Sequence, residues 1–238
     1  MKPTPIIIAH RGLHDVQPEN SVLGFRAAAS SGIEWVELDV QQSVEGLPVI
    51  MHDDTLKRTT GLAGRIDRHR AIQLARLRLR DGEGRPSDAH VPVLLATHAN
   101  PLASFDGNLL VEIKPCDAAA LVARTAQAMR MLHRHWIIQS FDRANLGHAR
   151  RVAPEVERAF LADNPRDLLS LDSPDFSAIH VAFGMIDDAL VKRAHAHGMR
   201  IGAWTVNDPA DLRRMIELGV DRIITDKPVL AKSLLQDE

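Results

Sequence analysis

Eight short apolar runs, spread along the whole of the 238-residue chain, constrain its fold more than any other feature. Each run is rich in Ile, Val or Leu, and a longer segment compatible with a helix follows it. The runs cover residues 6–9, 35–40, 109–113, 136–139, 157–162, 177–181, 200–204 and 222–225. Strands that alternate with helices predict a parallel sheet whose two faces are both covered.

Helical segments are predicted between these runs, at residues 20–31, 117–132, 143–152, 186–197 and 209–218. Three of them end at a glycine (Gly32, Gly198 or Gly219), which adopts the left-handed conformation of a helix end at little cost. Residues 165–169 are short and weakly patterned, so one of the eight helices has little support. The count of eight strands favours an α/β fold of the (β/α)8 TIM-barrel type, although a doubly wound open sheet satisfies the same alternation.

A long interruption, about residues 53–107, separates the second strand from the third within what we read as a single barrel domain over residues 1–238. It follows a segment, Leu47 to His52, that resembles a strand returning from the second one through a turn at Glu45-Gly46. Residues 65–85 carry seven arginines. We interpret the insertion as a solvated helix and loops at the barrel mouth; arginines that cover the substrate or touch lipid are the alternative.

Charge and cysteine content limit the partners and the compartment. The formal net charge of −2 provides no general field for nucleic acid or an anionic membrane. Cys116 is the one cysteine and cannot form an internal disulfide, and no apolar stretch is long enough for a signal peptide core or a membrane span. We expect a cytoplasmic protein with no nucleic-acid partner and no stable membrane insertion; its oligomeric state stays open.

Polar residues follow the apolar runs where the carboxyl ends of the strands are expected, which is where α/β folds bind ligands. His10 and Arg11 come directly after the first run, and His52 follows Val49 to Met51. A lone histidine is more often a packed or surface residue. Two histidines at strand ends, however, suit a reaction that needs both a general acid and a general base.

Carboxylates occupy alternate positions of two strands. Glu37 and Asp39 lie two residues apart and therefore on one face, and Glu112 and Lys114 repeat this spacing on the third strand. Salt bridges to Lys or Arg are one explanation. Three carboxylates at neighbouring strand ends favour instead one divalent cation, Mg²⁺ or Ca²⁺. The charges of such a site balance. The negative charges of three carboxylates and a phosphodiester equal the positive charges of a dication, Arg11 and Lys114, so a phosphate fits this site.

Two further strand ends carry side chains suited to a substrate. Gln139 can hydrogen-bond a phosphate oxygen or a metal-bound water. Phe141 and Trp204 can form a wall against the alcohol portion of a substrate. Packing at the barrel rim explains these three residues equally well. We assign surface or packing roles to the remaining histidines considered, His98, His133, His135, His148, His180, His195 and His197.

An ordered set of motifs resembles the glycerophosphodiester phosphodiesterase family. It consists of His-Arg-Gly at 10–12, Pro-Glu-Asn-Ser at 18–21, Glu-Leu-Asp-Val at 37–40, Pro-Val-Ile-Met-His-Asp at 48–53, Leu-Lys-Arg-Thr-Thr at 56–60, Val-Glu-Ile-Lys at 111–114, Gln-Ser-Phe at 139–141, Trp-Thr-Val-Asn at 204–207 and residues 219–228. Two segments depart from the family pattern, residues 43–46 after the second strand and 92–96 before the third.

The resemblance implies a TIM barrel with a small insertion after the second strand and hydrolysis of glycerophosphodiesters to sn-glycerol 3-phosphate and an alcohol. By position, it places the acid and base on His10 and His52, the metal carboxylates on Glu37, Asp39 and Glu112, and the phosphate-binding cations on Arg11 and Lys114. A phospholipase D-like activity on lysophospholipids and a non-catalytic glycerophosphodiester-binding module are the alternatives.

Overall fold

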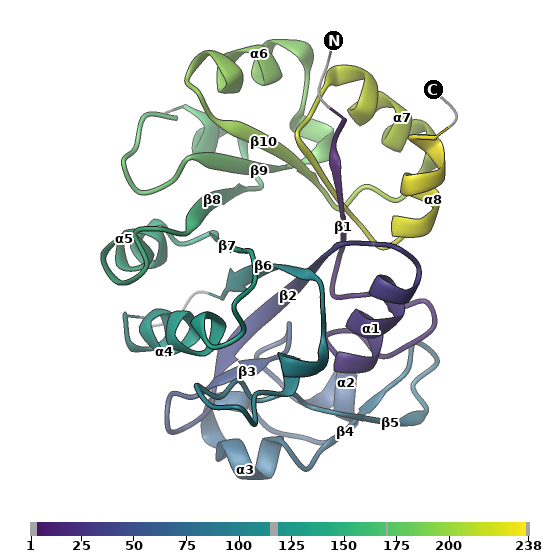
Figure 1. Ribbon diagram of the computed structural model, residues 1–238, viewed down its shortest axis with the longest axis vertical. Helices are drawn as coiled ribbons and strands as arrows, with labels where there is room; N and C mark the ends of the chain where they lie inside the picture. Colours follow the sequence, from purple (N-terminus) through teal and green to yellow (C-terminus); the bar gives the residue numbers. More distant parts are fainter. Residues whose placement is uncertain (1–3, 115–118, 170, 237–238) are drawn as a thin grey trace.

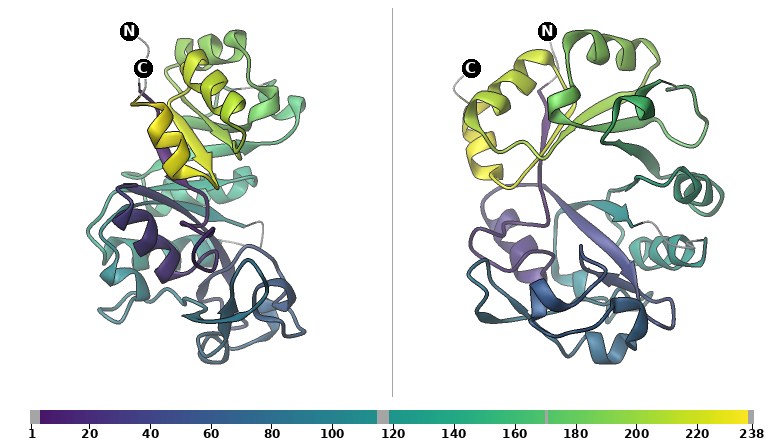
Figure 2. Two further views of the ribbon diagram at one scale, coloured as in Figure 1. Left: turned by 90° about the vertical axis from the view of Figure 1, so that its right-hand side faces the viewer. Right: turned by 180° about the vertical axis from the view of Figure 1, so that it is seen from behind.

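Eight parallel strands close into a barrel in the computed structural model, which describes residues 4–114, 119–169 and 171–236 (Figures 1 and 2). The strands are β1 (Ile6–Ala9), β2 (Trp35–Gln42), β6 (Asn108–Ile113), β7 (Trp136–Ser140), β8 (Glu157–Ala162), β9 (Ala178–Ala182), β10 (Arg200–Trp204) and β11 (Arg222–Thr225). The barrel closes because β1 pairs with β2 on one side and with β11 on the other, where Ile6 lies opposite Arg222. The predicted barrel is confirmed, and the open sheet is excluded.

Helices outside the barrel occupy nearly all of the predicted segments. They are α1 (Val22–Ser30), α4 (Ala119–Arg130), α5 (Arg143–Val152), α6 (Asp188–Ala196) and α7 (Pro209–Leu218), with the 3-10 turn η4 (Phe183–Met185) before α6. A further helix, α8 (Pro228–Leu234), was not predicted. Among the described residues between β8 and β9, the one helical element is the 3-10 turn η3 (Pro165–Leu168), which agrees with the weak pattern at residues 165–169. Cys116 and the first residues of the predicted helix 117–132 lie outside the described residues.

Alternation along the barrel strands separates the core from the site. Val36, Leu38 and Val40 of β2 belong to the large apolar cluster between the strands and the helices. The opposite face of each strand points into the barrel, where Ile8, Leu110, Ile137 and Ile224 form a separate buried cluster. A polar residue follows each of these four by two positions, namely His10, Glu112, Gln139 and Asp226. The apolar cluster therefore closes the barrel interior beneath the polar strand ends.

The insertion has an apolar core of its own, so its interpretation as a solvated helix and loops was wrong in this respect. The strand β3 (Pro48–Ile50) leads into it, and it contains α2 (Lys57–Thr60), η1 (Ile66–Arg68), α3 (Ala71–Leu74), β4 (Arg78–Arg80) and β5 (Pro86–His90). Eight apolar residues of the insertion, together with Val49 and Met51 just before it, form a buried cluster separate from the barrel core. The arginines lie at its surface, and several pair with acidic side chains, as Arg70 does with Glu45.

The insertion forms one end of the long axis of the molecule, away from β9, β10 and α6 (Figures 1 and 2). The strand β3, which leads into the insertion, runs antiparallel to β2 after a turn at Gly46, as predicted. The chain leaves it in extended form beside β3, where the Leu94 amide donates to the Pro48 carbonyl at 2.9 Å. Between Leu94 and β6, a stretch that the structure describes throughout, the one helical element is the 3-10 turn η2 (Pro101–Ser104). Residues 92–96, which depart from the family pattern, are therefore not followed by an α-helix before β6.

Candidate active site

Three carboxylates gather at the carboxyl ends of two neighbouring strands. Glu37 and Asp39 extend from β2 and Glu112 from β6, and the register pairs Asp39 directly with Glu112. All three are buried, and one oxygen of each lies within 4.8 Å of the others. The period of two puts Glu37 and Asp39 on one face of β2, and the register of β2 with β6 adds Glu112, so the three predicted metal ligands lie together.

The two predicted phosphate-binding cations contact these carboxylates. Lys114 Nζ lies 2.7 Å from Asp39 Oδ1 and 2.6 Å from Glu112 Oε1. The Arg11 backbone amide donates to Glu37 Oε2 at 3.0 Å, and Arg11 Nε lies 3.3 Å from Asp39 Oδ2. Arg11 adopts a left-handed conformation with φ 55°. Gly12 follows it at φ 84°, where a Cβ atom would approach the Gly24 carbonyl carbon and the Phe25 ring to 2.9 Å.

The protonation of the three carboxyls differs because their cationic neighbours differ. Burial alone would raise the pKa of Asp39, but Lys114 and Arg11 outweigh it and hold this pKa at about 2. Burial, with Asp39 beside it, raises the pKa of Glu112 to about 7. Burial and the same neighbour raise the pKa of Glu37 well above its usual value. The two native cations thus neutralise one carboxylate well and leave two that a further cation would stabilise.

Asn20 orients Asp39, a role that sequence reasoning missed. Its Nδ2 donates to Asp39 Oδ2 at 2.7 Å, and its Oδ1 accepts from the Asp39 backbone amide at 3.1 Å. Asn20 itself is held in a left-handed conformation, φ 54°, just before Ser21 caps α1. Its place in the Pro-Glu-Asn-Ser motif was the available signal, because asparagine tolerates this conformation better than most residues.

His52 lies just beyond β3 with its ring tied to the next residue. Its Nδ1 and Asp53 Oδ1 are 2.8 Å apart, and Gln41 Nε2 donates to the His52 carbonyl at 2.9 Å. Arg58 from α2 contacts both oxygens of Asp53, at 2.8 Å each, and also pairs with Glu19. Burial lowers the pKa of His52, which favours the neutral imidazole. Asp53 was in a recognised motif, but no role was predicted for it.

His10 lies just beyond β1 and contacts a residue from the other end of the chain. Its Nδ1 and Asp226 Oδ1 are 2.7 Å apart, and Asp226 follows β11 at the other end of the chain. No role was predicted for Asp226 either. The available signal was the Thr-Asp-Lys-Pro sequence that ends the last apolar run.

Gln139, Phe141 and Trp204 all line one cavity, an arrangement that both a substrate-contacting role and packing at the barrel rim allow. The Phe141 and Trp204 rings meet edge to face with centroids 5.5 Å apart. Gln139 Oε1 accepts from His180 Nδ1 at 2.7 Å, which turns its amide nitrogen toward Glu37 Oε1 at 3.5 Å. His180 is fully buried, and burial lowers its pKa well below the usual value. The packing role predicted for His180 therefore includes the orientation of Gln139.

A cavity of about 160 Å³ collects these groups. The predicted catalytic, phosphate-binding and substrate-contacting residues and two of the three predicted metal ligands line it; they are His10, His52, Arg11, Lys114, Gln139, Phe141, Trp204, Glu37 and Glu112. Asp39 lies beside it, in contact with Arg11 and Lys114. One wall is thus charged and the other aromatic.

A sequence model of the glycerophosphoryl diester phosphodiesterase family matches residues 10–230 of this chain. The chain belongs to this family. Members of the family hydrolyse glycerophosphodiesters, and this chain is an enzyme of that class. A glycerophosphodiester phosphodiesterase from Caldanaerobacter subterraneus subsp. tengcongensis is 28% identical over 94% of each chain. One from Bacillus subtilis is 27% identical over 94% of this chain and 84% of its own.

A solved structure supports the family assignment at the level of the fold. The phosphodiesterase from Oleispira antarctica, in complex with its product sn-glycerol-3-phosphate, superposes with a TM-score of 0.84 at 26% identity, over 99% of this chain and 98% of its own. Within the described residues of this phosphodiesterase, no helix is both long and apolar enough to cross a membrane.

Proposed function

We propose that this phosphodiesterase hydrolyses glycerophosphodiesters to sn-glycerol 3-phosphate and an alcohol, with His10 and His52 as acid and base and one divalent cation as cofactor. The observation that carries the proposal is the composition of one cavity wall. Two imidazoles, two cations and the carboxylates of Glu37 and Glu112 line the same 160 Å³ space. Cleavage of a phosphodiester needs a proton acceptor for the nucleophile, a proton donor for the leaving alkoxide, and positive charge around the phosphate.

The residues present fit a hard divalent cation. Glu37, Asp39 and Glu112 supply oxygen ligands only, which Mg²⁺ and Ca²⁺ prefer. Two of these carboxyls have raised pKa values because they are buried beside like charge, and a dication relieves that repulsion. Such an ion, when bound, supplies Lewis-acid stabilisation of charge on the phosphoryl oxygens.

The chain's own groups define how the substrate lies. Arg11 and Lys114 hold the phosphate through charge-assisted hydrogen bonds at the charged wall. His52 has a lowered pKa and is neutral near pH 7, so we assign it the base and His10 the acid. Phe141 and Trp204 lie against the alcohol portion and exclude water from that side.

The chain works as one unit in this proposal, since His10, His52 just before the insertion, and Trp204 near the end of the barrel line one cavity. The substrate is a small molecule. We keep the cytoplasm as the expected compartment, which fractionation of cells with an antibody to the protein would check.

The test is release of sn-glycerol 3-phosphate from glycerophosphocholine and glycerophosphoethanolamine with Mg²⁺, with Ca²⁺ and after chelation, with a lysophospholipid assayed in parallel. We expect release that chelation abolishes and one of the two ions restores. Release that is unaffected by chelation would contradict the cofactor, and turnover of the lysophospholipid alone would contradict the substrate class.

A further inference from the structure

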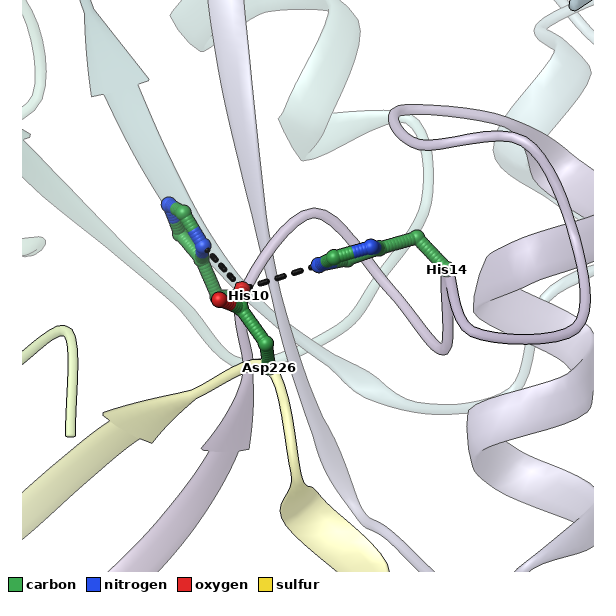
Figure 3. A group of neighbouring side chains, drawn as sticks. All are labelled: His10, His14 and Asp226. Atoms are coloured by element: carbon green, nitrogen blue, oxygen red, sulfur yellow. Dashed lines mark hydrogen bonds and ion pairs between the residues drawn. The ribbon is translucent and has the colours of Figure 1, made fainter. Parts of the chain in front are cut away.

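A single carboxylate oxygen at the end of β11 receives two imidazoles. Asp226 Oδ1 lies 2.7 Å from His10 Nδ1 and 2.8 Å from His14 Nε2. Figure 3 shows the two rings on opposite sides of the carboxylate, with the second nitrogen of His10 at the far end of its ring. His10 follows β1, and His14 lies in the loop that leads to α1, so Asp226 joins the two ends of the barrel sequence.

Asn207, which follows β10, holds the other carboxylate oxygen. Its Oδ1 accepts from the Asp226 backbone amide at 2.9 Å, and a backbone amide can only donate. The side-chain orientation of Asn207 is therefore determined, and its Nδ2 faces Asp226 Oδ2 at 2.7 Å. Three donors, two from the loop after β1 and one from the segment after β10, thus fix one carboxylate.

The proton positions follow from the charge of that carboxylate. Burial would raise the pKa of Asp226, but hydrogen bonds from His10, His14 and Asn207 outweigh it and hold this pKa well below the usual range. An ionised carboxylate only accepts, so both imidazoles must present an N–H to it. His10 consequently keeps a proton on Nδ1 whether its ring is neutral or protonated, so the proton that it gives to the substrate as the acid is the one on Nε2, in the cavity that its ring lines.

We propose that Asp226 is a positioning residue that fixes the tautomer and ring orientation of His10, and that His14 and Asn207 hold Asp226 in place for this role. The proposal rests on the proposed function, because it takes His10 as the residue that exchanges a proton with the substrate.

His14 has a second effect on this arrangement. Its hydrogen bond to Asp226 raises the pKa of His14, so the imidazole shares part of the carboxylate charge near neutral pH. The groups that face His14 are Asp226, Asp15 and Glu19, and Lys227 pairs with Asp15 at 2.8 Å. The loop of residues 11–17 is thereby tied to the segment after β11 at two points. Loss of His14 removes one anchor of Asp226 but leaves Asn207 and His10.

The experiment compares Asp226→Asn, His14→Phe and His14→Gln with the wild type, using glycerophosphocholine and Mg²⁺. His195→Phe is the matched control. His195 is on α6, does not line the cavity, and also contacts an aspartate, with its Nε2 3.0 Å from Asp221 Oδ2. We measure kcat and KM, the affinity for sn-glycerol 3-phosphate, and the thermal midpoint of unfolding.

Asp226→Asn should lower kcat by about 10²- to 10⁴-fold with little change in KM, since an amide can donate to His10 Nδ1 and favour the wrong tautomer. His14→Phe should lower kcat by about tenfold, the effect of one lost hydrogen bond to a charged group. His14→Gln keeps a donor and should recover much of that loss, while His195→Phe should leave kcat unchanged. A near-normal kcat for Asp226→Asn, or equal losses in His14→Phe and His195→Phe, would overturn the proposal.

Nitrogen-15 NMR of the imidazoles in the wild type tests the proposal without any substitution. We expect His10 to show a protonated Nδ1 and a bare Nε2 when it is neutral; the opposite tautomer would overturn the proposal even if Asp226→Asn does not fold. Inhibition by added Zn²⁺ that His14→Phe removes would also overturn it, because the cluster would then be a metal site. If His10→Ala retains full turnover, the proposed function fails; if only Asp226→Asn retains it, the positioning role alone fails.

Discussion

His10 and His52 use the same chemical device, yet two different kinds of structure build it. Each Nδ1 lies within hydrogen-bond distance of an aspartate, 2.7 Å for His10 and 2.8 Å for His52. The partner of His10 is 216 residues away and is brought close by barrel closure, whereas the partner of His52 is the next residue. The first pair joins two strand ends of the barrel, and the second lies where the chain enters the insertion.

The groups behind the two aspartates also differ. Asp226 is shared with a second imidazole, while Asp53 is shared with the guanidinium of Arg58, which stays charged at any working pH. Hydrogen bonds from Arg58 hold the pKa of Asp53 well below its usual range and occupy much of its charge. Asp53 therefore orients His52 without strongly favouring its protonated form. An aspartate can therefore orient each histidine of one site, while the group behind the aspartate decides how strongly its negative charge acts on that histidine.

The largest expected effect concerns the histidines themselves. His10→Ala and His52→Ala should each lower kcat by at least about 10²-fold without unfolding, because each removes one proton-transfer group. Steady-state kinetics with a thermal melt of each variant checks this, and His195→Ala serves as the control. A variant with near-normal turnover would remove that histidine from the mechanism and end the comparison.

The two aspartates should differ in their importance. We expect Asp53→Asn to lower kcat by about tenfold, the effect of weakening one hydrogen bond to a charged group, and thus less than Asp226→Asn. The reason is that Arg58 already shares the charge of Asp53 and that Gln41 independently holds the His52 backbone. Equal losses in the two variants would show that the shared guanidinium makes no difference.

The carboxylates between the two histidines should make the metal-free protein sensitive to pH. The pKa of Glu112 rises from 4.5 to about 7 on folding, so its contribution to stability is present below pH 4.5 and is lost as pH approaches 7. In the presence of a chelator, the free energy of unfolding should therefore decrease as pH rises over this range, and it should decrease more in the wild type than in Glu112→Gln. Addition of Mg²⁺ near pH 7 should stabilise the wild type and release protons, because the ligands must be deprotonated. A parallel pH dependence in the two proteins would contradict the assignment.

The smallest expected effect sharpens the difference between the aspartates. Arg58→Gln leaves the charge of Asp53 unshared, which should raise the pKa of His52. The base must be neutral, so the acid limb of the kcat/KM profile should move to higher pH, by less than about one unit. Arg85→Gln is the matched control, since Arg85 pairs with Asp81 on the surface of the insertion. A shift to lower pH would show that His52 is not the group that titrates on that limb.

Sequence patterns were sufficient for elements whose signal is local. The bounds of β1, β8, β10, β11, α5 and α7 agree with the predicted ranges, since an apolar run or a capped helix with a following glycine or proline depends on neighbouring residues. The separate core of the insertion was missed because its short strands and turns carry no sustained period. The bond from His180 to Gln139 was missed because a buried histidine on a strand looks like any packed residue.

The sequence by itself determined which side chains of one strand share a face and which follow its carboxyl end. That placed Glu37 with Asp39, Glu112 with Lys114, and His10 at a ligand-binding edge, because strand alternation is a property of consecutive residues. Only the tertiary structure decided which strand ends meet. The pairing of β1 with β11 brings Asp226 to His10, and the left-handed turn at Asn20 brings its amide to Asp39. Such contacts join residues far apart in the chain, and no local periodicity encodes them.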